Sequence, residues 1–137
     1  MDLESRIDLF RNATGFEGLK EPQIRQLGRL SLVRRFSKGQ IVFNENDACH
    51  HFHLVAQGLI KVSLVSYGGN RITYLLAGSG EPLNLVGPFS GAPRPLFAEA
   101  LEDALVFHIK REDFTSFCHG NPTVMQNIII ILGRAVD

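Results

Sequence analysis

The amino-acid sequence predicts a mainly β fold with flanking helices. Apolar and polar residues alternate in short runs through the middle of the chain. Gly, Asn, Asp and Pro residues separate these runs at intervals of about ten residues, which is typical of a sandwich or barrel. Helical spacing is confined to the two ends. Apolar residues make up 45% of the 137 residues, enough for one hydrophobic core in a domain of ordinary size.

The N-terminal segment predicts two short helices. The apolar residues of the first recur on one helix face and are Leu3, Ile7 and Phe10. Gly15 interrupts this spacing. The second helix is expected to begin at Pro22, because proline suits the first helical turn, and it carries Ile24 and Leu27 on one side.

From Leu32 onward, apolar residues recur at every second position, which predicts strands. The alternating sets, in chain order, are Leu32/Arg34/Phe36, Ile41/Phe43, Phe52/Leu54, Ile60/Val62/Leu64, Ile72/Tyr74/Leu76 and Leu105/Phe107/Ile109. No full-length helix alternates with these strands, so a parallel α/β sheet is not expected.

The C-terminal segment returns to helical spacing. A helix is expected from Arg111, with Phe114 and Phe117 on one face, and a second from Pro122, with Asn121 as its cap. The last helix is apolar along two stripes, one of Val124, Ile128 and Ile131 and one of Met125, Ile129, Leu132 and Val136. One stripe can pack on the strands, while the other needs a partner. The sequence therefore predicts a homodimer through Met125, Ile128, Ile129, Leu132 and Val136.

The net charge and the lack of a targeting pattern narrow the range of possible functions. Lys plus Arg and Asp plus Glu are 14 each, so the formal net charge is zero, and a chain without a basic excess is not expected to bind DNA. The N-terminus does not have the pattern of a signal peptide, and the longest apolar run, from Ile128 to Leu132, is far short of a membrane span. Cys49 and Cys118 lie far apart, as expected for reduced thiols in a cytoplasmic protein.

Several segments stand in a specific order and spacing along the chain. They are 39–47 (GQIVFNEND), 53–62 (HLVAQGLIKV), 69–71 (GNR), 90–94 (SGAPR), 98–104 (AEALEDA), 109–114 (IKREDF) and 121–122 (NP). Together they resemble the cyclic-nucleotide-binding-like sensor domain of Crp/Fnr-type bacterial transcription regulators. The resemblance covers nearly the whole chain, from about residue 8 to residue 132.

The resemblance implies a double-stranded β-helix, a jelly-roll-like β-roll, followed by a C-terminal dimerisation helix. Residues 1–121 would form the helical lead-in, the sensor roll and its closing helix, and residues 122–137 the start of the dimerisation helix. In this family a small-molecule effector bound in the roll acts through the dimer helix on a helix-turn-helix domain, which is absent from this chain. The chain would be either an excised sensor domain or a stand-alone relative.

The resemblance also implies a ligand-binding cassette between residues 80 and 95. In cyclic-nucleotide-binding members, an Arg and backbone N–H groups bind the cyclic phosphate, a carboxylate accepts the ribose hydroxyl, and a small hydroxyl side chain follows the Arg. Here Arg94 matches the Arg, but Leu85 stands near the carboxylate position and Pro95 follows Arg94. The candidate ligand-binding residues are Leu83, Asn84, Leu85, Arg94 and Pro95.

The two departures predict that cAMP and cGMP do not bind tightly. An unpaired buried ribose hydroxyl costs about 1–3 kcal/mol, and proline offers neither a hydroxyl nor an N–H to a phosphate. The effector is therefore unknown, and a carboxylate or aromatic acid held by Arg94 and Asn84 is an alternative.

A histidine-rich stretch offers an alternative from another class. Cys49, His51 and His53 are two residues apart, which would place all three side chains on one strand face, as zinc or haem ligands. A cupin-like metal-binding protein or enzyme would use His51 and His53, yet Gln57 stands where a cupin has Glu, and the next histidine is His108. Since no further ligand is spaced to join them, no metal site is predicted.

The sequence contains no GxSxG, HExxH or GxxxxGK motif. We therefore interpret the chain as a sensor and not as an enzyme.

Overall fold

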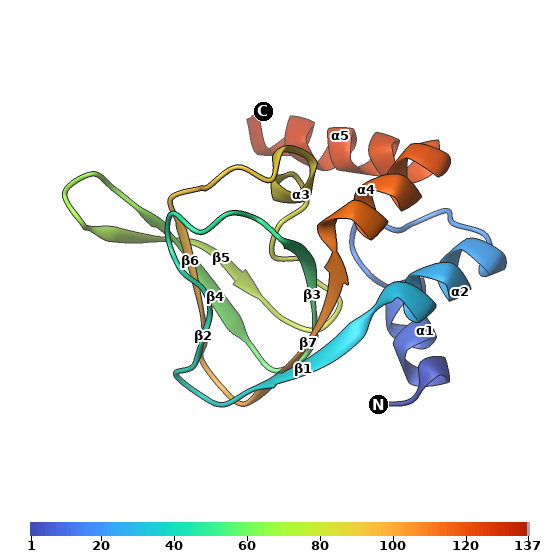
Figure 1. Cartoon of the computed structure of the whole chain (residues 1–137), viewed down its shortest axis with the longest axis horizontal. Helices are drawn as coiled ribbons and strands as arrows, with labels where there is room; N and C mark the ends of the chain where they lie inside the picture. Colours follow the sequence, from blue (N-terminus) through green and yellow to red (C-terminus); the bar gives the residue numbers. More distant parts are fainter. Residues whose placement is uncertain (137) are drawn as a thin grey trace.

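The computed structural model describes residues 1–136, with side chains as far as Arg134. Two helices, α1 (Leu3–Arg11) and α2 (Glu21–Leu30), precede the strands β1 (Leu32–Phe36), β2 (Ile41–Phe43), β3 (His51–Gln57), β4 (Ile60–Val65) and β5 (Arg71–Ala77). A short helix, α3 (Gly87–Ser90), leads into β6 (Leu96–Ala100) and β7 (Ala104–Lys110), and the helices α4 (Arg111–Gly120) and α5 (Pro122–Val136) follow. The predicted mainly β fold with flanking helices is confirmed (Figure 1).

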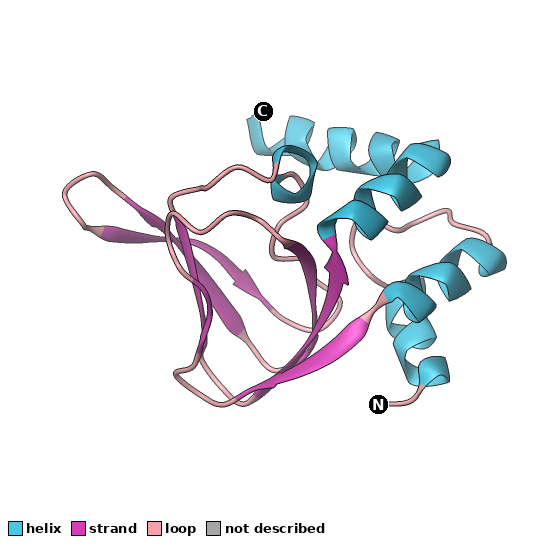
Figure 2. Ribbon diagram, viewed as in Figure 1, coloured by secondary structure: helices cyan, strands magenta, loops and turns pink. Residues whose placement is uncertain are grey.

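The strands form two antiparallel sheets that make a roll. One sheet has the order β1-β7-β3 and the other the order β2-β6-β4-β5. Figure 2 shows the strands on one side of the molecule and α1, α2, α4 and α5 on the other. The β4–β5 hairpin extends beyond the roll (Figure 1).

The sheet β1-β7-β3 separates two hydrophobic cores, because alternate residues of a strand face opposite sides. On one side, Phe52 and Phe107 pack against the helices, together with Phe10, Phe16 and Phe114. On the other side, Val55 and Val106 pack inside the roll against residues of the second sheet, such as Val62. The helices thus cover the outer face of one sheet, and the roll interior is enclosed between the two sheets.

The turn between β3 and β4 requires glycine. Gly58 has φ +88°, and a Cβ there would lie 2.6 Å from the carbonyl oxygen of Asp103. Both the left-handed conformation and the close approach exclude an ordinary side chain. The β3–β4 turn lies at the end of the roll opposite α3 and α5 (Figure 1).

Strand β5 departs from the predicted alternation. Ile72, Tyr74 and Leu76 are 62%, 64% and 51% exposed, whereas Ala77 is buried. β5 is an edge strand, and its register with β4 shifts between Val62 and Ser63. Ile72 lies opposite the exposed Leu64 and Leu76 opposite the partly exposed Lys61, on either side of this shift. This face of β5 therefore points out of the roll, and the apolar set read from the sequence does not lie in the core.

The last helix begins at Pro122, as predicted. Val124 and Ile128 are 0% and 6% exposed, and they belong to the chain's own core with Met125 packed against it. Ile128 therefore does not lie on an exposed stripe. Ile129 and Leu132 are 67% and 43% exposed, and the side chain of Val136 lies outside the described residues.

Candidate ligand-binding site

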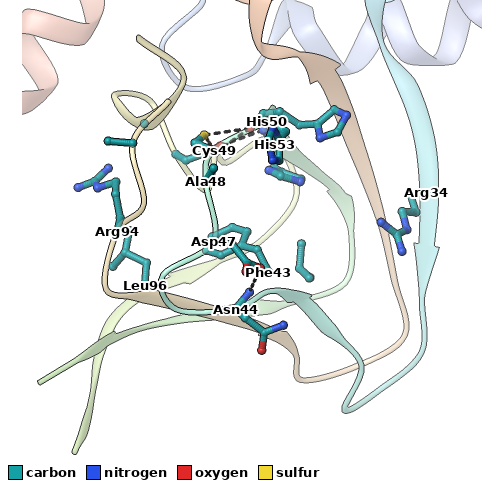
Figure 3. Close-up of a pocket in the computed structure, with 15 residues that line it drawn as sticks. Arg34, Phe43, Asn44, Asp47, Ala48, Cys49, His50, His53, Arg94 and Leu96 are labelled. Atoms are coloured by element: carbon teal, nitrogen blue, oxygen red, sulfur yellow. Dashed lines mark hydrogen bonds between the residues drawn. The ribbon is translucent and has the colours of Figure 1, made fainter. Parts of the chain in front are cut away.

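A cavity of about 360 Å³ opens inside the roll, beneath the segment that carries α3. This is near the lower end of the range of small-molecule pockets, about 300–1,000 Å³. Its lining comes from the strands β1–β3, the loop before β3 and the cassette, and consists of Arg34, Val42, Phe43, Asn44, Asp47, Ala48, Cys49, His50, His51, His53, Asn84, Gly87, Ala92, Arg94 and Leu96. Figure 3 shows most of these side chains.

The first part of the cassette is attached to β3 by backbone hydrogen bonds. The N–H of Gly80 donates to the carbonyl of Val55 at 2.8 Å, and the N–H of Leu83 donates to that of His53 at 3.0 Å. Asn84 continues this pattern with its side chain: its Oδ1 accepts from the N–H of His53 at 2.9 Å, and its Nδ2 donates to the carbonyl of His51 at 2.9 Å. The amide of Asn84 is thus occupied by β3.

The second part of the cassette is held from the other side. The carbonyl of Arg94 accepts from the N–H of Asn46 at 2.9 Å, and the carbonyl of Pro95 accepts from that of Val65 at 2.8 Å. The guanidinium of Arg111 donates to the carbonyls of Pro88 at 2.6 Å and Phe89 at 3.3 Å. Helix α3 is therefore joined directly to the start of α4.

Arg94 lines the cavity as a half-buried cation. A methyl group at Gly87 would lie 3.7 Å from its Nη1, so the guanidinium lies beside the start of α3. Within residues 1–136, no carboxylate lies within 4 Å of it. Asp47 is the acidic residue in the lining, and its carboxylate accepts from the N–H of Asn44 at 3.0 Å.

The other predicted ligand-binding residues lie elsewhere. Leu83 is 3% exposed and packs in the roll core, next to the cavity but not in its lining. Leu85 packs against the helix-side core, where its Cδ2 would lie 3.5 Å from a Cβ at Gly15. Pro95 is exposed. The structure thus brings Arg94 and Asn84 together at the cavity and directs Leu85 away from it.

Arg34 lines the cavity although the sequence patterns did not predict it. Arg34 lies on β1, whose register with β7 places it opposite Val106, a residue of the roll core. Its placement depends on this cross-strand register. The one signal in the sequence is that Arg34 shares a strand face with the buried Phe36.

Three histidines, His51, His53 and His108, form a second group, on the neighbouring strands β3 and β7. His53 lies opposite His108 in the β3–β7 register, and the ring of His51 lies 5.2 Å from that of His108 and 6.1 Å from that of His53. Burial is the main cause that lowers the pKa of His53 to about 3, and the neighbouring imidazoles and Arg34 act in the same direction. Burial also lowers the pKa values of His51 and His108. These three imidazoles are therefore neutral at pH 7.

Cys49 does not share a strand face with the histidines, because it precedes β3. Its thiol lies 3.5 Å from the carbonyl of His51 and 3.4 Å from Nδ2 of Asn84, and burial raises its pKa. Within residues 1–136, no three His, Cys, Asp or Glu side chains are placed to hold one metal ion. In the same part of the chain, the helices are too short or too polar to cross a membrane.

Comparison with known proteins identifies a family that the chain matches. A family described as "Cyclic nucleotide-binding domain" matches residues 33–121. A cyclic AMP receptor protein of Thermus thermophilus is 28% identical over 101 residues, which cover 74% of this chain and 47% of that protein. The chain thus spans about half the length of this curated relative.

Solved structures show the same fold. The catabolite activator protein of Thermus thermophilus superposes with a TM-score of 0.81 at 25% identity, covering 90% of this chain and 58% of that one. The sensor domain of the transcriptional regulator DNR from Pseudomonas aeruginosa superposes with a TM-score of 0.83 at 17% identity, covering 98% and 90%. The predicted β-roll with a C-terminal helix is confirmed.

Proposed function

The chain belongs to the cyclic nucleotide-binding domain family, and from this membership we propose that it senses a small anionic molecule for a Crp/Fnr-type transcription regulator. The effector would bind in the roll and act through α5 on a DNA-binding domain. We place this regulator in the bacterial cytoplasm. The proposed role is regulatory and not enzymatic.

The unpaired guanidinium of Arg94 carries this proposal. A half-buried cation without a carboxylate partner is costly, and an anionic ligand would remove that cost. The cassette is already held in place on both sides, by β3 and by Arg111, so little ordering would accompany binding. Because the amide of Asn84 is occupied by β3, we assign the acid group of the ligand to Arg94 alone.

The path from the cavity to α5 runs through α3 and α4. Arg111 at the start of α4 binds two carbonyls of α3, and the ring of Phe89 in α3 lies 6.0 Å from that of Phe114 in α4. Helix α5 follows α4 after one residue, and Figure 1 shows α3 beside α4. A ligand that shifts α3 would therefore shift α4 and the dimer helix with it.

Titration calorimetry is expected to separate small acids from cyclic nucleotides. We expect carboxylates such as hexanoate and adipate to bind, and Arg94→Gln to weaken them at least tenfold, the effect of about one charge-assisted hydrogen bond. We expect no heat from cAMP or cGMP below high-micromolar concentrations, since Leu85 packs away from the cavity and Pro95 has no donor.

Arg29→Gln, on an exposed helix face remote from the cavity lining, is the matched control and should leave binding unchanged. Sub-micromolar cAMP binding that disappears in Arg94→Ala would mean that main-chain donors suffice for a cyclic phosphate. Acid binding that is equal in the wild type and in Arg94→Gln would contradict the proposed function.

We also propose that α5 forms a homodimer through its exposed side, which carries Ile129, Ile130 and Leu132. Apolar side chains so placed on a helix are typical of an interface. Ile129→Asp should shift the chain toward monomer by a factor of ten or more in dissociation constant, measured by sedimentation equilibrium. Gln26→Asp, which places the same charge on an exposed position of α2, is the control. A wild-type chain that stays monomeric at millimolar concentration would refute the dimer.

A further inference from the structure

The inner face of the sheet β1-β7-β3, which forms one wall of the roll and lines the cavity in part, changes character along its length. Near the β3–β4 turn, its inward side chains are apolar, as in Val55 and Val106. Toward the cassette, the inward positions of the same strands carry His53 and His108, and Arg34 lines the cavity from β1. A roll interior that needed only to be packed would continue the apolar pattern.

Arg34 supplies a fixed positive charge to this wall. Arg34 is exposed to solvent, and its charge is one of the causes that lower the pKa values of His51, His53 and His108, so its guanidinium lies near these rings. Its guanidinium carbon lies 5.0 Å from the centre of the Phe36 ring, and within residues 1–136 no carboxylate lies within 4 Å of it.

The remaining charged groups near these rings do not neutralise the wall. Lys110 and His50 also act to lower the pKa of His51, and Glu112 acts in the opposite direction. The imidazole of His53 packs against Phe43, with ring centres 5.6 Å apart, and its Nδ1 is shielded from solvent without a hydrogen-bond partner. The wall thus offers one guanidinium and neutral imidazoles, each with an N–H donor and an acceptor.

Arg34 and Arg94 lie on opposite sides of the cavity. Figure 3 shows Arg34 on β1 at one side and Arg94 in the cassette at the other, with the loop before β3 between them. Both line the same space of about 360 Å³, and both lack an ion-pair partner within the described residues. One acid group can satisfy one of these cations, but not both.

We propose that the cavity recognises a small molecule with two acidic groups, one bound by Arg94 and the other by Arg34 beside His51 and His53. This inference rests on the proposed function, because it assigns the first acid group to Arg94. It adds that Arg34 is a specificity-determining residue, which distinguishes diacids from monoacids. The ligand class is that of short linear dicarboxylates and molecules with the same two charged ends.

The test compares diacids with monoacids of equal chain length at constant ionic strength. Succinate, glutarate and adipate are titrated against butyrate, pentanoate and hexanoate by calorimetry. At least one diacid is expected to bind ten times more tightly than its monoacid. Arg34→Gln should remove that advantage, because it weakens the diacid at least tenfold and weakens the monoacid less. Arg35→Gln, the exposed neighbour on the opposite strand face, is the matched control and should behave as the wild type.

A second readout follows the imidazoles by nuclear magnetic resonance. An acid group bound at Arg34 should raise the pKa of His51, because a nearby negative charge favours the protonated ring, and a monoacid at Arg94 should not. Equal affinities for diacids and monoacids, or an effect of Arg34→Gln no larger than that of Arg35→Gln, would overturn this inference and leave the role of Arg94 standing. Acid binding that does not depend on Arg94 would overturn both.

Discussion

Replacement of Phe52 by alanine is expected to lower the free energy of unfolding by about 3–5 kcal/mol. Phe52 is 0% exposed, its ring stacks on that of Phe114 with centres 4.2 Å apart, and it meets the edge of Phe16 at 5.7 Å. The substitution leaves a cavity where β3 meets α4 and the segment after α1. Urea unfolding followed by circular dichroism measures the loss.

Tyr67→Ala is the control for this substitution, because Tyr67 is fully exposed in the β4–β5 turn and should change stability by less than about 0.5 kcal/mol. The free energy of unfolding of a small domain is about 5–15 kcal/mol in total, so the Phe52→Ala chain can fail to fold. Phe52→Leu, which retains most of the volume, keeps the measurement possible and should cost about 1–2 kcal/mol. A cost below 1 kcal/mol for the alanine variant would show that this aromatic cluster is not the structural centre of the helix-side core.

Local sequence patterns predicted the elements whose structure is decided locally. α5 begins at Pro122 because proline suits the first helical turn, and most strands fall where the alternation placed them. The side chain of Asn121, which was expected to cap this helix, instead accepts from Nε2 of Gln23 and donates to the carbonyl of Phe117 in α4. The family resemblance included segment 98–104, which overlaps only the end of β6. Strand β6 has no clear alternation of its own, since Leu96, Phe97 and Ala98 are all buried. Elements that depend on neighbouring residues alone are therefore readable from the chain.

The features that depend on pairing between distant strands were not readable in the same way. The exposed face of β5 follows from its pairing with β4, and the place of Arg34 in the cavity follows from the pairing of β1 with β7. Asn84 was expected to contact a ligand, but its amide forms the hydrogen bonds with the β3 backbone that a neighbouring strand would otherwise form. These outcomes depend on which strands become neighbours, and that information is not contained in local spacing.

Acidification is expected to destabilise the fold through His53. The pKa of this imidazole is about 3 in the folded chain, against 6.5 for an unperturbed histidine, and burial is the main cause. Below pH 6.5 the unfolded chain therefore binds a proton that the folded chain does not. The free energy of unfolding keeps its full value above pH 6.5. As the pH decreases toward 3, it falls by about 1.4 kcal/mol per pH unit, a loss of about 5 kcal/mol from this group.

His53→Phe separates this titration from packing. Phenylalanine keeps an aromatic ring against Phe43 but binds no proton, so the slope of stability against pH should decrease by about one proton between pH 6.5 and 3. The same substitution at His51, whose pKa is also lowered, should remove a smaller part of the slope, because that ring is less buried. Urea unfolding at half-unit pH intervals measures both slopes. If the wild type and His53→Phe lose stability in parallel, the carboxylates and not this imidazole control acid unfolding, and His53 is protonated in the folded roll.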